Sequence, residues 1–76
     1  MTRYFFDMRE DDILTPDEEG LEFANFELAK REAALSIAGW AQEAVETSAK
    51  ADQLVVEVRT TDGPIFKARF TYETIE

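Results

Sequence analysis

The sequence predicts a small α+β domain in the order ββαββ, with an antiparallel sheet that carries one long helix packed on one face. Three observations lead to this prediction: strand-like alternation near both ends of the chain, a helical apolar stripe between them, and an Asp-Gly hairpin signal. The 76 residues are expected to form a single domain, 1–76, close to the size at which one core barely offsets chain entropy. Nearly every large apolar side chain should therefore be needed for folding.

The first strand is expected over residues 3–9. Tyr4, Phe6 and Met8 alternate there with residues that are mostly charged, which is the two-residue period of a strand with one buried face. The following segment, residues 10–23, is less regular, because turn-forming residues interrupt two short apolar runs. Each run could supply a short strand, and we expect one short, imperfect partner strand.

A long helix should begin at Phe26 and persist to about Ala49. Asn25 is a suitable N-cap, because its side chain can accept a hydrogen bond from an unpaired amide of the first turn. One helical face carries an apolar stripe of Phe26, Ala29, Ala33, Ile37, Trp40, Ala41 and Ala44. The alanines allow the helix to approach the sheet closely, and Trp40 is expected to fill the space that they leave.

The last two strands are expected to form a hairpin around the turn Thr61–Pro64. Before the turn, Leu54, Val56 and Val58 lie on one side of a run rich in β-branched residues. After the turn, the chain alternates Phe66, Ala68, Phe70 and Tyr72 with Ile65, Lys67, Arg69 and Thr71. The Asp-Gly pair favours a tight connection because its positions require positive φ.

Composition limits the chemistry that the chain can perform. The formal net charge is −9, and both cysteine and histidine are absent. This excludes disulfides, thiolate nucleophiles and the commonest metal ligand, and leaves carboxylates as the acid–base groups near neutral pH. We expect a non-catalytic protein without a cofactor or a small-molecule substrate. With no apolar run near the roughly 20 residues that cross a bilayer, and no signal peptide, we also expect a cytoplasmic protein that does not bind membranes.

Acidic residues are concentrated between the first strand and the helix. Glu10, Asp11, Asp12, Asp17, Glu18, Glu19 and Glu22 lie in a segment without lysine or arginine. Their oxygens could hold a hard cation, although the spacing matches no EF-hand loop, or they could simply keep the hairpin solvated. We favour a structural interpretation, in which carboxylates accept hydrogen bonds from loop amides and Gly20 adopts a backbone angle closed to other residues.

The outer sheet face is one candidate surface. Its basic residues, which could bind an anion, are Arg3, Arg9, Arg59, Lys67 and Arg69. Nucleic acid is disfavoured as the partner, because only Phe5 offers a stacking platform and no RNA-recognition consensus is present. A protein partner could instead cover Phe5, Val55 and Ile65. Alternatively, the face is solvated and joined by cross-strand pairs such as Glu57 with Lys67.

The outer face of the predicted helix is a second candidate surface. Leu28, Leu35 and Gly39 lie about opposite the apolar stripe. Glycine in a helix interior costs about 1 kcal/mol relative to alanine, so a close approach by another helix would explain its presence. A second copy packed there would form a symmetric dimer. The alternative is two scattered surface leucines and a tolerated glycine.

Sequence motifs also suggest a family. In chain order, these motifs are residues 3–6 (Arg-Tyr-Phe-Phe), residues 16–20 (Pro-Asp-Glu-Glu-Gly) and the helix positions Ala29, Glu32 and Ala33. Through them the chain resembles a family of short, uncharacterised bacterial proteins over most of its length. That family is a domain of unknown function, so the resemblance implies membership but no activity. The chain is more remotely similar to HicB-type antitoxin domains, which share the turn and the alanine spacing.

These observations predict a small acidic module of unknown function that acts by protein–protein interaction, most simply as a homodimer. Nucleic-acid binding through the basic outer face, and antitoxin-like inhibition of a partner protein, are the alternatives.

Overall fold

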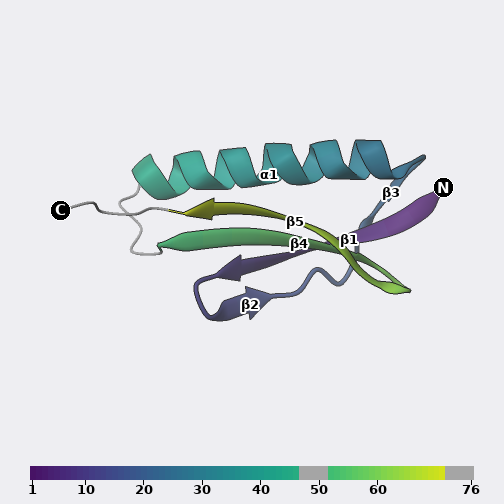
Figure 1. Cartoon of the computed structure of the whole chain (residues 1–76), viewed down its shortest axis with the longest axis horizontal. Coiled ribbons are helices and arrows are strands. Elements are labelled where there is room, and N and C mark those ends of the chain that lie inside the picture. Colours follow the sequence, from purple (N-terminus) through teal and green to yellow (C-terminus); the bar gives the residue numbers. More distant parts are fainter. Residues whose placement is uncertain (47–51, 72–76) are drawn as a thin grey trace.

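One long helix packs along one face of an open antiparallel sheet (Figure 1). The computed structural model describes residues 1–46 and 52–71. Along the chain these form β1 (Thr2–Glu10), β2 (Ile13–Thr15), β3 (Leu21–Phe23), α1 (Phe26–Glu46), β4 (Gln53–Thr60) and β5 (Gly63–Thr71). The predicted α+β class is confirmed, and the element order is βββαββ in place of ββαββ.

Strand β1 pairs with β4 along one edge and with two short strands, β2 and β3, along the other. The second short strand is the one that the sequence did not predict. The sheet order is β2-β1-β4-β5, and β3 pairs with β1 as well. Strand β2 pairs antiparallel with residues 8–10 of β1, whereas β3 pairs antiparallel with residues 2–4. The expectation of one imperfect partner strand is wrong, because the turn residues 16–20 divide this segment into two short strands at opposite ends of β1.

The predicted hairpin between β4 and β5 is confirmed, but its turn differs from the expectation. Thr61 and Asp62 form the connection, and of the Asp-Gly pair only Gly63 has positive φ. Thr60 pairs with Gly63 across the connection, and Thr60 Oγ1 accepts a hydrogen bond from the Asp62 amide at 3.1 Å. Gly63 has φ 125°, a conformation that side chains with a Cβ rarely adopt, so the glycine is needed at this turn. Tyr72, expected in the last strand, lies outside the described residues.

The helix begins where the sequence predicts. Asn25 Oδ1 accepts a hydrogen bond from the Leu28 amide at 3.0 Å, which confirms Asn25 as the N-cap. Phe26, the first helical residue, packs edge-to-face on Phe66 with ring centroids 6.0 Å apart. The helix is described as far as Glu46, and its expected continuation to about Ala49 lies outside the described residues.

The core lies between α1 and the sheet and consists of two clusters. One contains Tyr4, Ala29, Ala33, Val56 and Val58, and the other contains Ala41, Ala44 and Leu54. Ile37 and Trp40 pack against both clusters, so they join the two ends of the core. Because the buried helical residues are alanines, the helix backbone lies close to the sheet and the larger side chains fill the flanks.

Large apolar side chains are nevertheless exposed, contrary to the expectation that folding would use nearly all of them. Helix α1 packs mainly on β4 and β5, and it leaves the end of β1 and the adjacent β2 uncovered. Met8 is accordingly half-exposed and Ile13 is 72% exposed. One helix is too narrow to cover the whole sheet. Within the described residues, no helix has the length and apolar character to cross a membrane.

The close helix–sheet contact gives a test of the core. Ala33 is fully buried on the face of α1 that packs on the sheet, whereas the next residue, Ala34, is exposed. Ala33→Leu should lower the free energy of unfolding by about 1–3 kcal/mol, because the added carbons must displace the sheet. Ala34→Leu adds the same carbons in solvent and should change it by less than about 0.5 kcal/mol. Urea unfolding followed by circular dichroism measures both, and equal stabilities would contradict this packing.

Candidate functional site

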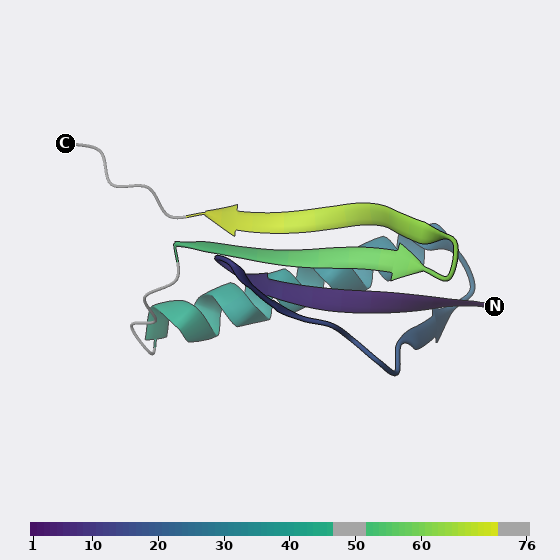
Figure 2. The same cartoon turned by 90° about the horizontal axis from the view of Figure 1, so that it is seen from below.

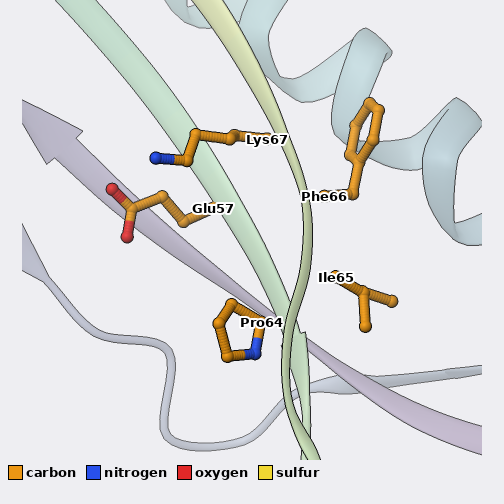
Figure 3. A pocket seen from close by; sticks show the side chains of 5 residues that line it. All are labelled: Glu57, Pro64, Ile65, Phe66 and Lys67. Atoms are coloured by element: carbon orange, nitrogen blue, oxygen red, sulfur yellow. The ribbon is translucent and has the colours of Figure 1, made fainter.

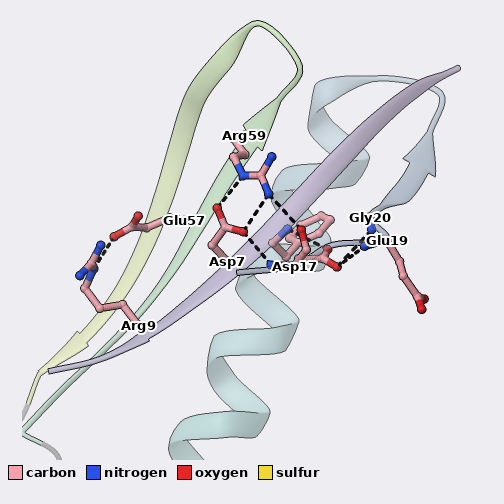
Figure 4. A network of polar contacts seen from close by, with 8 residues as sticks. Asp7, Arg9, Asp17, Glu19, Gly20, Glu57 and Arg59 are labelled. Atoms are coloured by element: carbon pink, nitrogen blue, oxygen red, sulfur yellow. Dashed lines mark hydrogen bonds and ion pairs between the residues drawn. The ribbon is translucent and has the colours of Figure 1, made fainter. Parts of the chain in front are cut away.

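The densest group of polar contacts in the described chain surrounds Asp17, in the loop between β2 and β3 (Figure 4). Asp17 Oδ2 accepts a hydrogen bond from the Phe6 amide at 3.1 Å. Its Oδ1 accepts from the amides of Glu19 and Gly20, both at 3.1 Å. Phe6 lies in the part of β1 between the residues paired by β2 and those paired by β3. The carboxylate therefore replaces a strand partner there.

Two further residues hold this loop to the sheet. Asp7 Oδ1 accepts a hydrogen bond from the Asp17 amide at 2.8 Å. Arg59 donates from Nε to Asp7 Oδ2 at 2.8 Å and from Nη2 to the Asp17 carbonyl at 3.0 Å. Asp7 is 7% exposed, and both its oxygens are engaged. We call Asp7, Asp17, Gly20 and Arg59 the Asp17 clasp.

Gly20 closes the clasp, since no other residue fits its position. It has φ 72°, and an added Cβ would lie 2.9 Å from the Tyr4 carbonyl oxygen. Real Cβ atoms do not approach backbone that closely, and residues other than glycine rarely adopt this φ. The structural interpretation of this loop is therefore confirmed: a carboxylate binds loop amides, and Gly20 supplies the backbone angle.

The clasp sets the ionisation of Asp17. Partial burial acts to raise the pKa of Asp17. Hydrogen bonds from three backbone amides, together with the charge of Arg59, outweigh this effect, so the pKa lies below the ordinary aspartate value of about 3.8. The Asp17 side chain is therefore ionised near neutral pH, and as a carboxylate it accepts the hydrogen bonds that hold the loop.

The other acidic residues of this segment form no metal site within the described chain. Asp11, at φ 51° in the β1–β2 turn, accepts hydrogen bonds from the amides of Asp52 and Gln53 at 3.2 and 3.1 Å. Its carboxylate thus ties that turn to the beginning of β4. Asp11 and Asp17 both bind backbone amides, which leaves the hard-cation interpretation without a cluster of ligands among residues 1–46 and 52–71.

Three of the candidate anion-binding residues are engaged within the chain. Arg59 belongs to the Asp17 clasp, and Arg9 Nε donates to Glu57 Oε2 at 2.9 Å, a contact that raises the pKa of Arg9. Arg3 donates to the Glu19 carbonyl at 2.7 Å and lies 3.8 Å from a Glu22 carboxylate oxygen. The side chains of Lys67 and Arg69 make no hydrogen bond or ion pair within the described residues.

Glu57 and Lys67 are opposite each other in the strand register, as expected, but their side chains form no ion pair. The two residues face each other across β4 and β5, but the Glu57 carboxylate turns to Arg9 on the opposite side. The planar guanidinium of Arg9 matches the geometry of a carboxylate better than the ammonium of Lys67 does, so Glu57 pairs with Arg9.

The apolar residues proposed for the outer sheet face are less accessible than expected. Val55 is 3% exposed and lies between Arg9 and Arg69 in the register, so it cannot contact a partner in this conformation. The Arg59 guanidinium lies 4.5 Å from the centre of the Phe5 ring and covers it. Both placements correct the sequence expectation, because long arginine side chains cover apolar neighbours.

Ile65 is displaced by a β-bulge. The register shifts between Val58 and Arg59, so that Phe66 faces Val58 while Pro64 faces Arg59. Ile65 is therefore the extra residue, and it points to the side of β5 away from Pro64 (Figure 3). It is exposed, but it does not share a side with Lys67 as the alternation predicted.

The outer helix face lies as the sequence predicts. Leu28 is 43% exposed and Leu35 is 60% exposed. A Cβ built on Gly39 would meet no heavy atom within 4 Å among the described residues. Nothing in the fold of one copy therefore requires glycine at this position.

Comparison with known proteins gives one match. The family model described as Domain of unknown function (DUF6894) matches residues 3–71. No curated protein and no solved structure matches the chain.

The lowered pKa of Asp17 predicts an acid-dependent loss of stability. Because the unfolded chain binds the proton at a higher pH than the folded chain, the contribution of Asp17 is complete above about pH 4 and is lost as pH falls through its folded-state pKa. Asp17→Asn should be less stable than the wild type by about 1 kcal/mol at pH 7, because its amide nitrogen cannot accept a hydrogen bond. The difference should narrow as pH falls below about 4.

Glu18→Gln is the matched control, because it removes the same charge from an exposed neighbour. Its stability should follow that of the wild type across the pH range. Urea denaturation at each pH measures all three proteins. If Asp17→Asn and Glu18→Gln gave the same pH dependence, the clasp would not be what lowers the pKa.

Proposed function

We propose that this chain, which belongs to the family described as Domain of unknown function (DUF6894), is a non-catalytic module that self-associates through the outer face of α1. The carrying observation is the combination of Leu28, Leu35 and Gly39 on one exposed helix face. Their spacing of seven and four residues places them in one line along the helix. The glycine lowers helix stability without serving any contact of a single copy.

A second copy fits this face in an antiparallel arrangement. Arg31 lies about 40° around the helix from Leu35, and the last turn of α1 contains Glu46 and no basic residue. Antiparallel packing brings Arg31 of each helix toward the acidic end of the other, and it also opposes the two helix dipoles favourably. Leucine side chains can then approach the partner backbone at Gly39, where no side chain intervenes.

A non-catalytic function is supported by the chemistry of the described residues. The sequence lacks histidine and cysteine, and the best-connected carboxylates, Asp7 and Asp17, are committed to backbone amides and Arg59. Nucleic-acid binding has less support, because three of the five candidate bases contact carboxylates or carbonyls and Arg59 covers the Phe5 ring. Antitoxin-like inhibition has no specific contact in its favour. We also propose a cytoplasmic location, which agrees with the absence of cysteine.

Two substitutions test self-association. Leu35→Glu should shift the protein from dimer to monomer, because it places a charge in the contact. Gly39→Ala should raise the unfolding free energy of the monomer by up to about 1 kcal/mol and still weaken the dimer, since it fills the space for the partner helix. Sedimentation velocity over a concentration series measures the association.

Ala34→Glu is the matched control, because Ala34 is exposed on the same helix but about 100° away from Leu35. It should leave the dimer unchanged. A wild-type protein that remained monomeric at all concentrations would refute the proposal, and so would equal dimerisation of the wild type and Leu35→Glu.

A further inference from the structure

Strand β5 is the outermost strand of the sheet, and no described strand lies along its outer edge (Figure 2). It contains nine residues, whereas β2 and β3, at the other side of the sheet, contain three each. Along residues 65–69, a strand edge without a neighbouring described strand presents backbone N–H and C=O groups that can pair with another extended chain. The helix face proposed for self-association does not include this edge.

The two faces of β5 differ in chemistry. Lys67 and Arg69 are exposed on the outer face and, as noted above, have no ionic partner in the described chain. Phe66 and Ala68 face the helix side and are half-buried. A strand added beside β5 would therefore meet positive charge on one face and apolar surface on the other.

A hollow of about 430 Å³ adjoins the first half of β5 and also reaches the neighbouring strand β4. It is lined by Glu57, Pro64, Ile65, Phe66 and Lys67. Figure 3 shows Glu57, Pro64 and Lys67 on one side of β5, and Ile65 and Phe66 on the other.

A second copy of β5 is a poor occupant of the edge. In a symmetric antiparallel pair, residues opposite each other lie on the same side of the sheet. Every such register that overlaps most of β5 places Lys67 or Arg69 directly opposite or diagonal to a like charge of the other copy. Like charges in these positions destabilise strand pairing, whereas a strand of opposite charge is stabilised.

We propose that the outer edge of β5, along residues 65–69, binds an acidic extended peptide, which adds to the sheet as a further strand. Acidic side chains at every second position of the peptide lie beside Lys67 and Arg69, and apolar side chains between them lie beside Phe66 and Ala68. Seven of the 17 acidic residues of the chain lie within residues 10–22, around β2 and β3. Strand β2 lies three strand spacings, or roughly 14 Å, from β5. That distance exceeds the Debye length of about 8 Å at physiological ionic strength, so the repulsion of the peptide by these seven residues is screened.

Peptide titration tests the proposal. The probe is a capped six-residue peptide of alternating glutamate and valine, added to ¹⁵N-labelled protein and followed by amide chemical shifts. We expect shifts concentrated in residues 66–71, and none with the corresponding lysine–valine peptide. The double substitution Lys67→Glu with Arg69→Glu should weaken binding by roughly tenfold or more. Two single substitutions on the helix, Arg31→Glu, which reverses a charge away from β5, and Leu35→Glu, which tests self-association, should leave binding unchanged.

Methylation of alternate backbone nitrogens separates strand addition from charge attraction. One of the two alternating patterns must abolish binding, because its methyl groups point toward β5 and remove the hydrogen bonds. The proposal is wrong if both methylated peptides bind like the parent, if the glutamate–valine peptide does not bind, or if oligothymidylate shifts the same amides. It is also wrong if β5 amides become protected from hydrogen exchange with rising protein concentration alone, since a second copy would then occupy the edge.

Discussion

The carboxylate of Asp17 is the contact on which this arrangement depends, because it takes the place of a missing strand. Strands β2 and β3 pair with the two ends of β1 and leave the middle without a strand partner on that edge. The Asp17 side chain binds the Phe6 amide in this gap, while Asp7 and Arg59 hold the backbone of the same loop. Without the carboxylate, an amide in the middle of the sheet would lose its protein partner, at a cost of about 1–3 kcal/mol if it stayed dry.

The same contacts decide which surfaces remain free. The clasp engages Arg59 and covers Phe5, and the Arg9–Glu57 pair engages the next part of the outer face. Much of the outer face of the central strands is therefore occupied by pairs within the chain. The surfaces that remain exposed include the outer face of α1, the uncovered apolar side chains of β2, and Lys67 and Arg69 on β5.

Local periodicity was sufficient to predict the helix, the long strands and the final hairpin, because each depends on neighbours in sequence. The spacing of Asp17 and Gly20 likewise indicated a loop in which a carboxylate binds nearby amides. Three features could not be predicted in this way: the burial of Asp7, the covering of Val55 by arginines, and the displacement of Ile65 by a bulge. Each depends on the register between strands up to about fifty residues apart, which a single sequence does not specify.

Hydrogen exchange at the Phe6 amide tests the central claim most directly, since this amide faces a carboxylate where a strand would otherwise lie. In the wild type we predict protection comparable to that of the amides paired between β1 and β4. In Asp17→Ala, exchange at Phe6 should accelerate by more than the global loss of stability explains, with the β4–β5 amides following global unfolding only. A Phe6 amide that exchanges freely in the wild type, or that stays equally protected in Asp17→Ala, would contradict the account.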